Sequence, residues 1–133
     1  MRVLLADDQP EIRSALRLLL EQEPEFVVVG EAATADDLLA QTGAYDPDVV
    51  MLDWELPDKD DSRKPGAAAR QQLIASLRAL SPGLKVIALS GRLEARKAAF
   101  AAGADGFVSK GDPPEHLLSA LREVMATIDK PPI

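Results

Sequence analysis

The side chains that could do chemistry in this chain follow short apolar runs of β-type residues. They are Asp7 and Asp8 after the run 3–6, Asp53 after 49–52, Ser90 after 86–89 and Lys110 shortly after 107–108. In an open parallel sheet, ligands and reacting groups collect outside the carboxyl ends of the strands. The pattern therefore predicts three carboxylates, a hydroxyl and an amine around one crevice. This set has the outline of a metal-assisted phosphoryl-transfer site.

The three aspartates are the part of this set that favours a metal ion. Two like charges about 4 Å apart repel by roughly 4 kcal/mol at an effective dielectric constant of about 20, so a cluster of acids is strained unless a cation lies there. Oxygen ligands together with several waters are what Mg²⁺ accepts. The alternative is that Asp7 and Asp8 cap the first helix, because Asp-Asp-Gln-Pro is also a good sequence for a helix start.

Asp53 is the candidate nucleophile. A carboxylate can attack phosphorus and form an acyl phosphate. The metal and the ammonium of Lys110 would neutralise charge on the phosphoryl oxygens, and the hydroxyl of Ser90 would donate a hydrogen bond to one of them. Each residue alone could equally be an ordinary strand end or surface residue, so this interpretation depends on their joint placement.

Alternating strands and helices must position these side chains. The expected strands are Arg2–Ala6, Phe26–Gly30, Asp48–Leu52, Lys85–Leu89 and Gly106–Ser109. The expected helices are Pro10–Glu21, a short one capped by Thr34 that ends at Ala40, Ala67–Leu80, Leu93–Ala102, and a last one that Asp112 caps and that ends near Thr127. Strands that alternate with helices predict an α/β fold, a doubly wound (βα)5 parallel sheet with helices on both faces, as in flavodoxin-like proteins.

Length and composition limit the remaining classes of protein. The 133 residues fit one domain with one core, and no apolar run approaches the length of a membrane span. The absence of cysteine excludes thiolate chemistry, and the single His116 cannot build a histidine-rich zinc site. Residues 1–62 carry 16 acids and 4 bases, which argues against a broad nucleic-acid surface in that half.

The chain resembles a bacterial response-regulator receiver domain over essentially its whole length. The matching segments are Asp7-Asp8 with Arg13, the run 53–57, Ser90-Gly91 and the run 102–110. The resemblance implies that Asp53 is the phospho-acceptor, that Asp8 binds Mg²⁺ directly and Asp7 largely through water, and that the backbone carbonyl of Glu55 is a third protein ligand. It also implies that Phe107 is an aromatic switch residue, although a plain core phenylalanine is the alternative.

The resemblance further implies a phospho-accepting signalling switch, not an enzyme beyond its own phosphorylation and dephosphorylation. We expect a cytoplasmic receiver over 1–129, then a linker or tail from 130 to 133. The expected partner is a sensor histidine kinase or phosphotransfer protein, with a possible homodimer on phosphorylation and no membrane. The runs 28–32 and 113–118 are similar to those of receivers with a helix-turn-helix output domain. DNA would be bound only through such a separate domain, to control transcription.

Two features depart from the family pattern or leave alternatives open. The segment 58–65 looks like an insertion of about five residues, which we expect to be an exposed, mobile loop that affects partner choice. Glu55 and Arg92 flank the expected entrance, where they could bridge the mouth or form a surface pair of little value. The alternative functions are an interaction adaptor that needs no phosphorylation, and a Mg²⁺-dependent phosphatase that works through an aspartyl phosphate.

Overall fold

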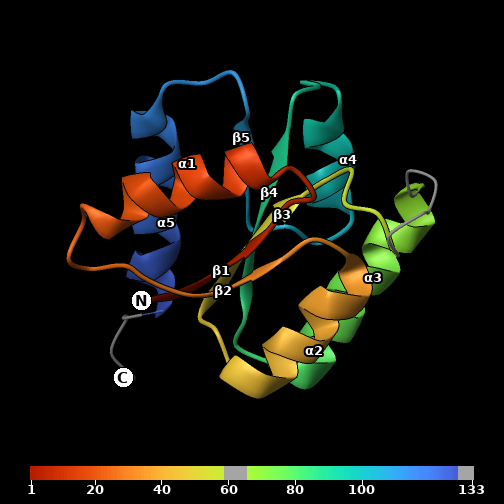
Figure 1. The fold of residues 1–133 in the computed structure, drawn as a ribbon. Helices are drawn as coiled ribbons and strands as arrows, with labels where there is room; N and C mark the ends of the chain where they lie inside the picture. The colour runs from red at the N-terminus through yellow and green to blue at the C-terminus, as the bar shows by residue number, and fades with distance from the viewer. Residues whose placement is uncertain (59–65, 129–133) are drawn as a thin grey trace.

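A single five-stranded parallel sheet runs through the centre of the molecule (Figure 1). The computed structural model describes residues 1–58 and 66–128. The strands are β1 (Arg2–Ala6), β2 (Val27–Ala32), β3 (Val49–Asp53), β4 (Lys85–Ser90) and β5 (Gly106–Ser109). Their order in the sheet is β2-β1-β3-β4-β5, and every neighbouring pair is parallel. This confirms the predicted doubly wound fold and makes β1 and β3 neighbours.

Helices cover both faces of this sheet. They are α1 (Pro10–Glu21), α2 (Ala35–Tyr45), α3 (Ala67–Leu80), α4 (Ala95–Ala101) and α5 (Pro114–Ile128). Figure 1 shows α1 and α5 on one face and α2, α3 and α4 on the other. None of the helices in the described residues is long and apolar enough to cross a membrane.

Each face of the sheet has its own hydrophobic cluster, since alternate strand residues point to opposite sides. Leu4, Val50, Leu52 and Ala88 pack with residues of α2, α3 and α4. Val3, Leu5, Met51 and Ile87 pack with residues of α1 and α5. The buried strands therefore hold their carboxyl ends firmly, which is where the candidate residues emerge.

Several predicted boundaries need correction. β2 ends at Ala32, not at Gly30, because Glu31 and Ala32 still pair with the end of β1. α2 runs through Gly43 to Tyr45, past the expected end at Ala40, and stops where Asp46 takes a left-handed conformation with φ 47°. A glycine inside a helix costs only about 1 kcal/mol, so it need not end one.

Two helices begin at different residues from those predicted. α4 is shorter than predicted and begins at Ala95, after a turn in which Ala95 N–H donates to Arg92 O. α5 begins at Pro114, so Asp112 does not cap it; the Asp112 carboxylate instead accepts from the Ser109 N–H at 3.2 Å. The predicted cap at Thr34 is present, where Oγ1 accepts from the Asp37 N–H.

Two sequence predictions fall on parts of the chain outside the described residues. Apart from Asp58, the expected mobile loop covers positions 59–65, and the expected linker starts at position 130. Both therefore stay predictions.

Candidate active site

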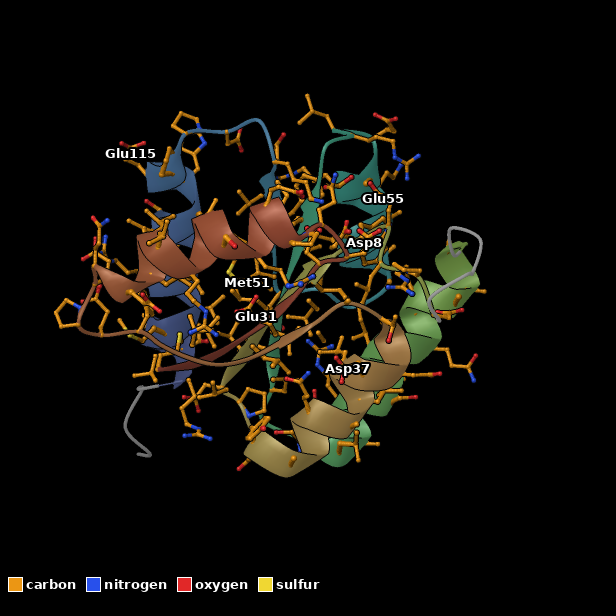
Figure 2. The ribbon with its side chains drawn as sticks, in the orientation of Figure 1. Asp8, Glu31, Asp37, Met51, Glu55 and Glu115 are labelled. Carbon is orange, nitrogen blue, oxygen red and sulfur yellow. The ribbon has the colours of Figure 1, made fainter. Side chains whose placement is uncertain are left out.

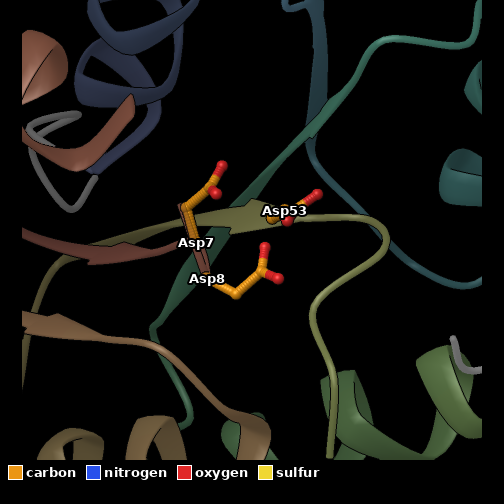
Figure 3. A group of neighbouring side chains, drawn as sticks. All are labelled: Asp7, Asp8 and Asp53. Atoms are coloured by element: carbon orange, nitrogen blue, oxygen red, sulfur yellow. The ribbon is translucent and has the colours of Figure 1, made fainter. Parts of the chain in front are cut away.

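The carboxylates of Asp7, Asp8 and Asp53 converge at the carboxyl end of the sheet (Figure 3). Asp7 and Asp8 follow β1, and Asp53 ends the neighbouring strand β3. One oxygen from each of the three side chains lies within 4.8 Å of the other two. The strand order thus brings together the acids that the sequence singled out.

Asp7 and Asp8 do not cap α1, the helix that follows them. The residue at the N-cap of α1 is Gln9, which makes no capping hydrogen bond with its side chain. Asp7 Oδ1 instead accepts from the Gln9 N–H at 2.9 Å, outside the helix. Arg13 of α1 reaches back and donates to the Asp7 carbonyl at 2.6 Å. The helix-capping alternative is therefore wrong for the conformation seen here.

Asp53 lies in an environment that disfavours its charge. The residue is only 2% exposed. Burial, together with the negative charge of Asp7, raises the pKa of Asp53 to about 6, although Lys110 acts in the opposite direction. A carboxylate that is buried beside another acid is stabilised by any cation that enters the site. The electrostatics therefore agree with the geometry in favouring a bound cation.

The two oxygens of Asp53 have different surroundings. Oδ1 accepts a hydrogen bond from the Glu55 N–H at 3.1 Å and lies 3.3 Å from Lys110 Nζ. Within the described residues, no hydrogen bond or ion pair involves Oδ2. One oxygen is thus held in place, while the other keeps its lone pairs for a metal or for a reacting atom.

Lys110 joins the acids of two strands. Its Nζ lies 2.9 Å from Asp7 Oδ2 as well as 3.3 Å from Asp53 Oδ1. Burial of Lys110 works against its charged form. The close ion pair with Asp7 and the attraction of Asp53 outweigh that effect and raise the pKa of Lys110 above its ordinary value. The side chain therefore stays cationic inside the cluster.

Ser90 and Arg92 meet Glu55 at the rim of the site. Ser90 is fully buried, and its Oγ donates to Glu55 Oε1 at 3.0 Å. Arg92 Nε lies 3.8 Å from the same oxygen, so Glu55 and Arg92 form an ion pair. Because 58% of the Arg92 side chain is exposed, this ion pair contributes little to stability. Figure 2 shows Glu55 at the same end of the sheet as Asp8.

Arg70 of α3 is a charged neighbour whose significance the sequence did not reveal. It falls on the helical stripe with Leu73, Ile74 and Leu77, and an arginine in an apolar stripe was the only signal. The residue is 1% exposed and pairs with Asp58 at 3.2 Å. Its Nε and Nη1 have no hydrogen-bond partner in the described part of the chain.

Charge connects Arg70 to the candidate site. Burial lowers the pKa of Arg70, and the charges of Asp58, Asp53 and Glu55 partly offset that effect. Arg70 is therefore a buried cation on which the carboxylates of Asp53 and Glu55 both act electrostatically.

Phe107 lies beside a hollow away from the acids. Its side chain is partly buried and packs against the cluster on the face of α2, α3 and α4. It also lines a cavity of about 350 Å³ between α4, β5 and α5, together with Phe100 and Val124. Arg96 stacks over the Phe100 ring at 5.2 Å from its centroid. This position is compatible with both the switch and the core interpretation.

The donor set fits Mg²⁺. It consists of carboxylate oxygens from three aspartates, and one of them, Asp8, is exposed to solvent. Mg²⁺ prefers oxygen ligands and keeps several of its waters, so a site with one side open suits it. Asp7 and Asp53 are buried and repel each other, so a cation bound beside them would stabilise their charged forms.

Comparisons of sequence agree with this arrangement. The family model described as the response regulator receiver domain matches residues 3–122. The nitrate/nitrite response regulator protein NarL of Escherichia coli (strain K12) is 32% identical over 124 residues, which cover 93% of this chain and 54% of that protein. The response regulator UvrY of Escherichia coli O157:H7 is 32% identical over 126 residues, which cover 93% and 54%. The chain thus spans about half the length of the curated relatives it matches.

Comparisons of structure give the same result. A two-component response regulator of the LuxR family from Aurantimonas sp. SI85-9A1 superposes with a TM-score of 0.78 at 29% identity, covering 95% of this chain and 85% of that one. The isolated REC domain of RcsB from Salmonella enterica serovar Typhimurium, in the presence of the phosphomimetic BeF3-, gives 0.79 at 26% identity, covering 94% and 88%. Because the family match and the fold agree over nearly the whole described chain, this protein belongs to the response regulator receiver domain family.

Proposed function

We propose that this receiver domain accepts a phosphoryl group on Asp53 from a phosphohistidine donor. As a family member, the chain is a phosphorylation-based signalling switch of the two-component type. The observation that carries the assignment to Asp53 is its position, because it is buried against Asp7 and Lys110 with one oxygen outside any described hydrogen bond. Asp7 also contacts Lys110, but of the three clustered acids only Asp53 belongs to β3, the central strand of the sheet.

The proposed transfer uses Oδ2 of Asp53. This oxygen attacks phosphorus as the bond between phosphorus and the donor imidazole nitrogen breaks. The nitrogen keeps the electron pair of that bond, and Asp53 becomes an acyl phosphate. Lys110 faces the negative charge that develops on the phosphoryl oxygens. Asp53 has to be ionised to attack, and a pKa of about 6 leaves it mostly ionised at neutral pH.

Asp8, Asp7 and Asp53 would hold Mg²⁺, with the Glu55 carbonyl as the further protein ligand that we predict. When bound, the ion would offset charge on the acids and on the phosphoryl oxygens. Asp7 already shares its Oδ2 with Lys110 at 2.9 Å, which supports an indirect role for Asp7 and a direct one for exposed Asp8.

Phosphorylation would change the face formed by α4, β5 and α5. Ser90 ends β4, and its Oγ accepts from the Arg92 N–H in the turn before α4, so movement of Ser90 reaches that helix. Phe107 would then turn inward as the switch residue. Phe107 borders the hollow between α4, β5 and α5, and the exposed Phe100 on the same face is a candidate contact for a partner.

The wider biology of the protein is also a proposal. We infer a cytoplasmic protein phosphorylated by a sensor histidine kinase or phosphotransfer protein, with homodimerisation on phosphorylation. We expect the receiver to occupy 1–129, with a linker or tail from 130. Control of transcription would require a separate DNA-binding output domain. NarL is a response regulator, whereas a 30% identical relative in Nitrobacter winogradskyi is a protein-glutamate methylesterase/protein-glutamine glutaminase, so relatives differ in their activity.

Intact mass after incubation with Mg²⁺ and a small acyl-phosphate donor tests the proposed function. We expect the addition of one phosphoryl group, which is lost in Asp53→Asn and after removal of Mg²⁺ with a chelator. Asp36→Asn is a matched control, because Asp36 is an exposed aspartate on α2 that does not belong to the three-acid cluster. An unmodified wild-type protein would favour the adaptor, and modification that survives in Asp53→Asn would place the acceptor elsewhere.

A further inference from the structure

In this structure, the hydroxyl of Ser90 is already engaged by a neighbouring carboxylate. Ser90 Oγ donates to Glu55, at 3.0 Å from Oε1 and 3.3 Å from Oε2. The same oxygen accepts from the Arg92 N–H at 3.1 Å. Ser90 is 0% exposed and the Glu55 side chain only 19%, so water competes little for the contact. Glu55 thus occupies the hydroxyl that phosphoryl transfer would need.

A serine hydroxyl carries one donor hydrogen. Ser90 therefore cannot donate fully to Glu55 and to a phosphoryl oxygen on Asp53 at the same time. We propose that the Glu55 carboxylate is an internal competitor for the Ser90 hydroxyl and must be displaced before Ser90 can bind the phosphoryl group. This inference rests on the proposed function and deepens it, because it gives the Glu55 side chain a role separate from that of its carbonyl.

Charge repulsion supplies the force for the displacement. Glu55 lies in the turn after Asp53, where its own N–H donates to Asp53 Oδ1 at 3.1 Å. A phosphoryl group on Asp53 would place new negative charge beside the Glu55 carboxylate. Like charges in a largely buried site repel strongly. Phosphorylation thus weakens the contact between Glu55 and Ser90 at the moment when Ser90 is needed elsewhere.

After displacement, the Glu55 carboxylate would still lie near two cationic side chains. Arg92 Nε already lies 3.8 Å from Glu55 Oε1 at the open rim of the site. Arg70 is also close enough for the charge of Glu55 to act on its pKa, together with the charges of Asp58 and Asp53. Glu55 can therefore leave Ser90 without becoming an isolated charge, which keeps the exchange reversible.

The contact between Glu55 and Ser90 therefore opposes the conformational change until phosphorylation breaks it. A hydrogen bond to a charged group is stronger than one between neutral groups, so the unphosphorylated arrangement resists release of Ser90. Because Ser90 Oγ also holds the Arg92 N–H, its capture by Glu55 fixes the turn that leads into α4. Glu55 therefore keeps the turn before α4 in the unphosphorylated conformation until a phosphoryl group outcompetes it.

A titration with BeF3-, a phosphoryl mimic, in excess Mg²⁺ tests the competition. Calorimetry should show that Glu55→Ala binds BeF3- about tenfold more tightly than wild type, which corresponds to about 1.4 kcal/mol. In a Ser90→Ala background the same change should alter the affinity by less than twofold, because no hydroxyl remains to be released. Glu55→Gln, whose amide oxygen can still accept from Ser90, should show a smaller gain than Glu55→Ala. All of these substitutions leave the backbone carbonyl of residue 55 in place.

Glu94→Ala is the matched control, since Glu94 is exposed and caps no backbone group with its side chain. It should bind BeF3- within twofold of wild type. In the absence of BeF3-, amide NMR resonances of 90–92 should shift in Glu55→Ala and stay in place in Glu94→Ala; an unchanged spectrum in Glu55→Ala would contradict the contact.

Equal gains from Glu55→Ala in the wild-type and Ser90→Ala backgrounds would overturn the competition while leaving the proposed function intact. Failure of the wild type to bind BeF3-, with Asp53→Asn indistinguishable from it, would overturn both.

Discussion

Lys110 Nζ, at the end of β5, lies closer to Asp7 at the end of β1 than to Asp53 at the end of β3, with distances of 2.9 Å and 3.3 Å. In the sheet, β3 and β4 separate β1 from β5. The lysine side chain thus crosses the carboxyl end of the sheet and neutralises charge on two acids that repel each other. This relationship makes the charge state of the site a shared property of Asp7, Asp53 and Lys110.

Lys110→Ala should retain some phosphorylation from a small donor but lose its coupling to the conformational change. The reason is that Lys110 both offsets the phosphoryl charge and connects β5 to the acids. The variant should also unfold more easily, by about 2 kcal/mol at pH 7.5, because two buried carboxylates lose their cation. Amide NMR of 93–107 before and after phosphorylation measures the coupling. Lys97→Ala, at an exposed position of α4, is the control; undiminished shifts in Lys110→Ala would remove Lys110 from the switch.

In the metal-free protein, the free energy of unfolding of Asp53→Asn, relative to that of wild type, should be higher at pH 7.5 than at pH 3.5. The pKa of Asp53 is raised from 3.8 to about 6 in the folded state, so the folded state holds this proton more tightly than the unfolded chain. The wild-type protein therefore loses stability as the pH rises from about 4 to about 6, and Asn does not titrate. The difference should grow by at most about 3 kcal/mol over this window. Urea denaturation at a series of pH values measures it.

Mg²⁺ should remove most of this pH-dependent difference, since a cation compensates the ionised carboxylate. The matched control is Asp36→Asn, whose stability should follow that of wild type across the same pH range. If the difference in free energy of unfolding between Asp53→Asn and wild type stays constant from pH 3.5 to 7.5, folding does not raise the pKa of Asp53.

Asp8→Ala should weaken Mg²⁺ binding by at least tenfold. Asp8 supplies an exposed oxygen to the cluster, whereas Asp7 is already paired with Lys110. Trp54, which follows Asp53 and is 5% exposed, should report binding through a change in its fluorescence. Asp36→Ala should titrate like wild type. Identical titrations of Asp8→Ala and wild type would mean that the metal assignment is wrong.

Arg70→Met should leave the free energy of unfolding unchanged or raise it by about 1 kcal/mol. Within residues 1–58 and 66–128, Nε and Nη1 of the buried Arg70 have no hydrogen-bond partner. One ion pair with the half-exposed Asp58 does not offset the desolvation cost of such a group. Arg78→Met should instead lower stability slightly, because it removes a 2.6 Å ion pair with Asp105. Urea denaturation compares the two variants. A loss of several kcal/mol in Arg70→Met would show that Arg70 has partners that outweigh its burial.

Local sequence patterns determined most of the elements and the chemical inventory of the site. Apolar runs that end in Asp7, Asp53 and Ser90 predict buried parallel strands, and all of these residues lie at strand ends in one sheet. The helix that was expected to end at Ala102 ends at Ala101, and Gly103 takes φ 107° just after it. These features depend on neighbours in the chain, which is why periodicity and turn chemistry suffice to predict them.

Boundaries were less predictable, because they depend on partners far away in the sequence. β2 continues to Ala32 because Ala6 of β1 is there to pair with it. Asp112 has the residue type of a cap, yet its carboxylate accepts from the Ser109 N–H. A local motif offers a hydrogen-bond acceptor, and the surrounding fold decides which donor reaches it.

Only the tertiary structure decided how the site residues use one another. The sequence offered Glu55 and Arg92 as a possible bridge, but it contained no sign that Glu55 accepts the hydrogen bond of Ser90, 35 positions away. It placed Arg70 on an apolar stripe without showing that the side chain is 1% exposed. Residue types fix which groups can carry charge or donate hydrogen bonds. Which of them meet depends on strand order, side-chain rotamers and burial, and these are settled by contacts between segments that are distant in the chain.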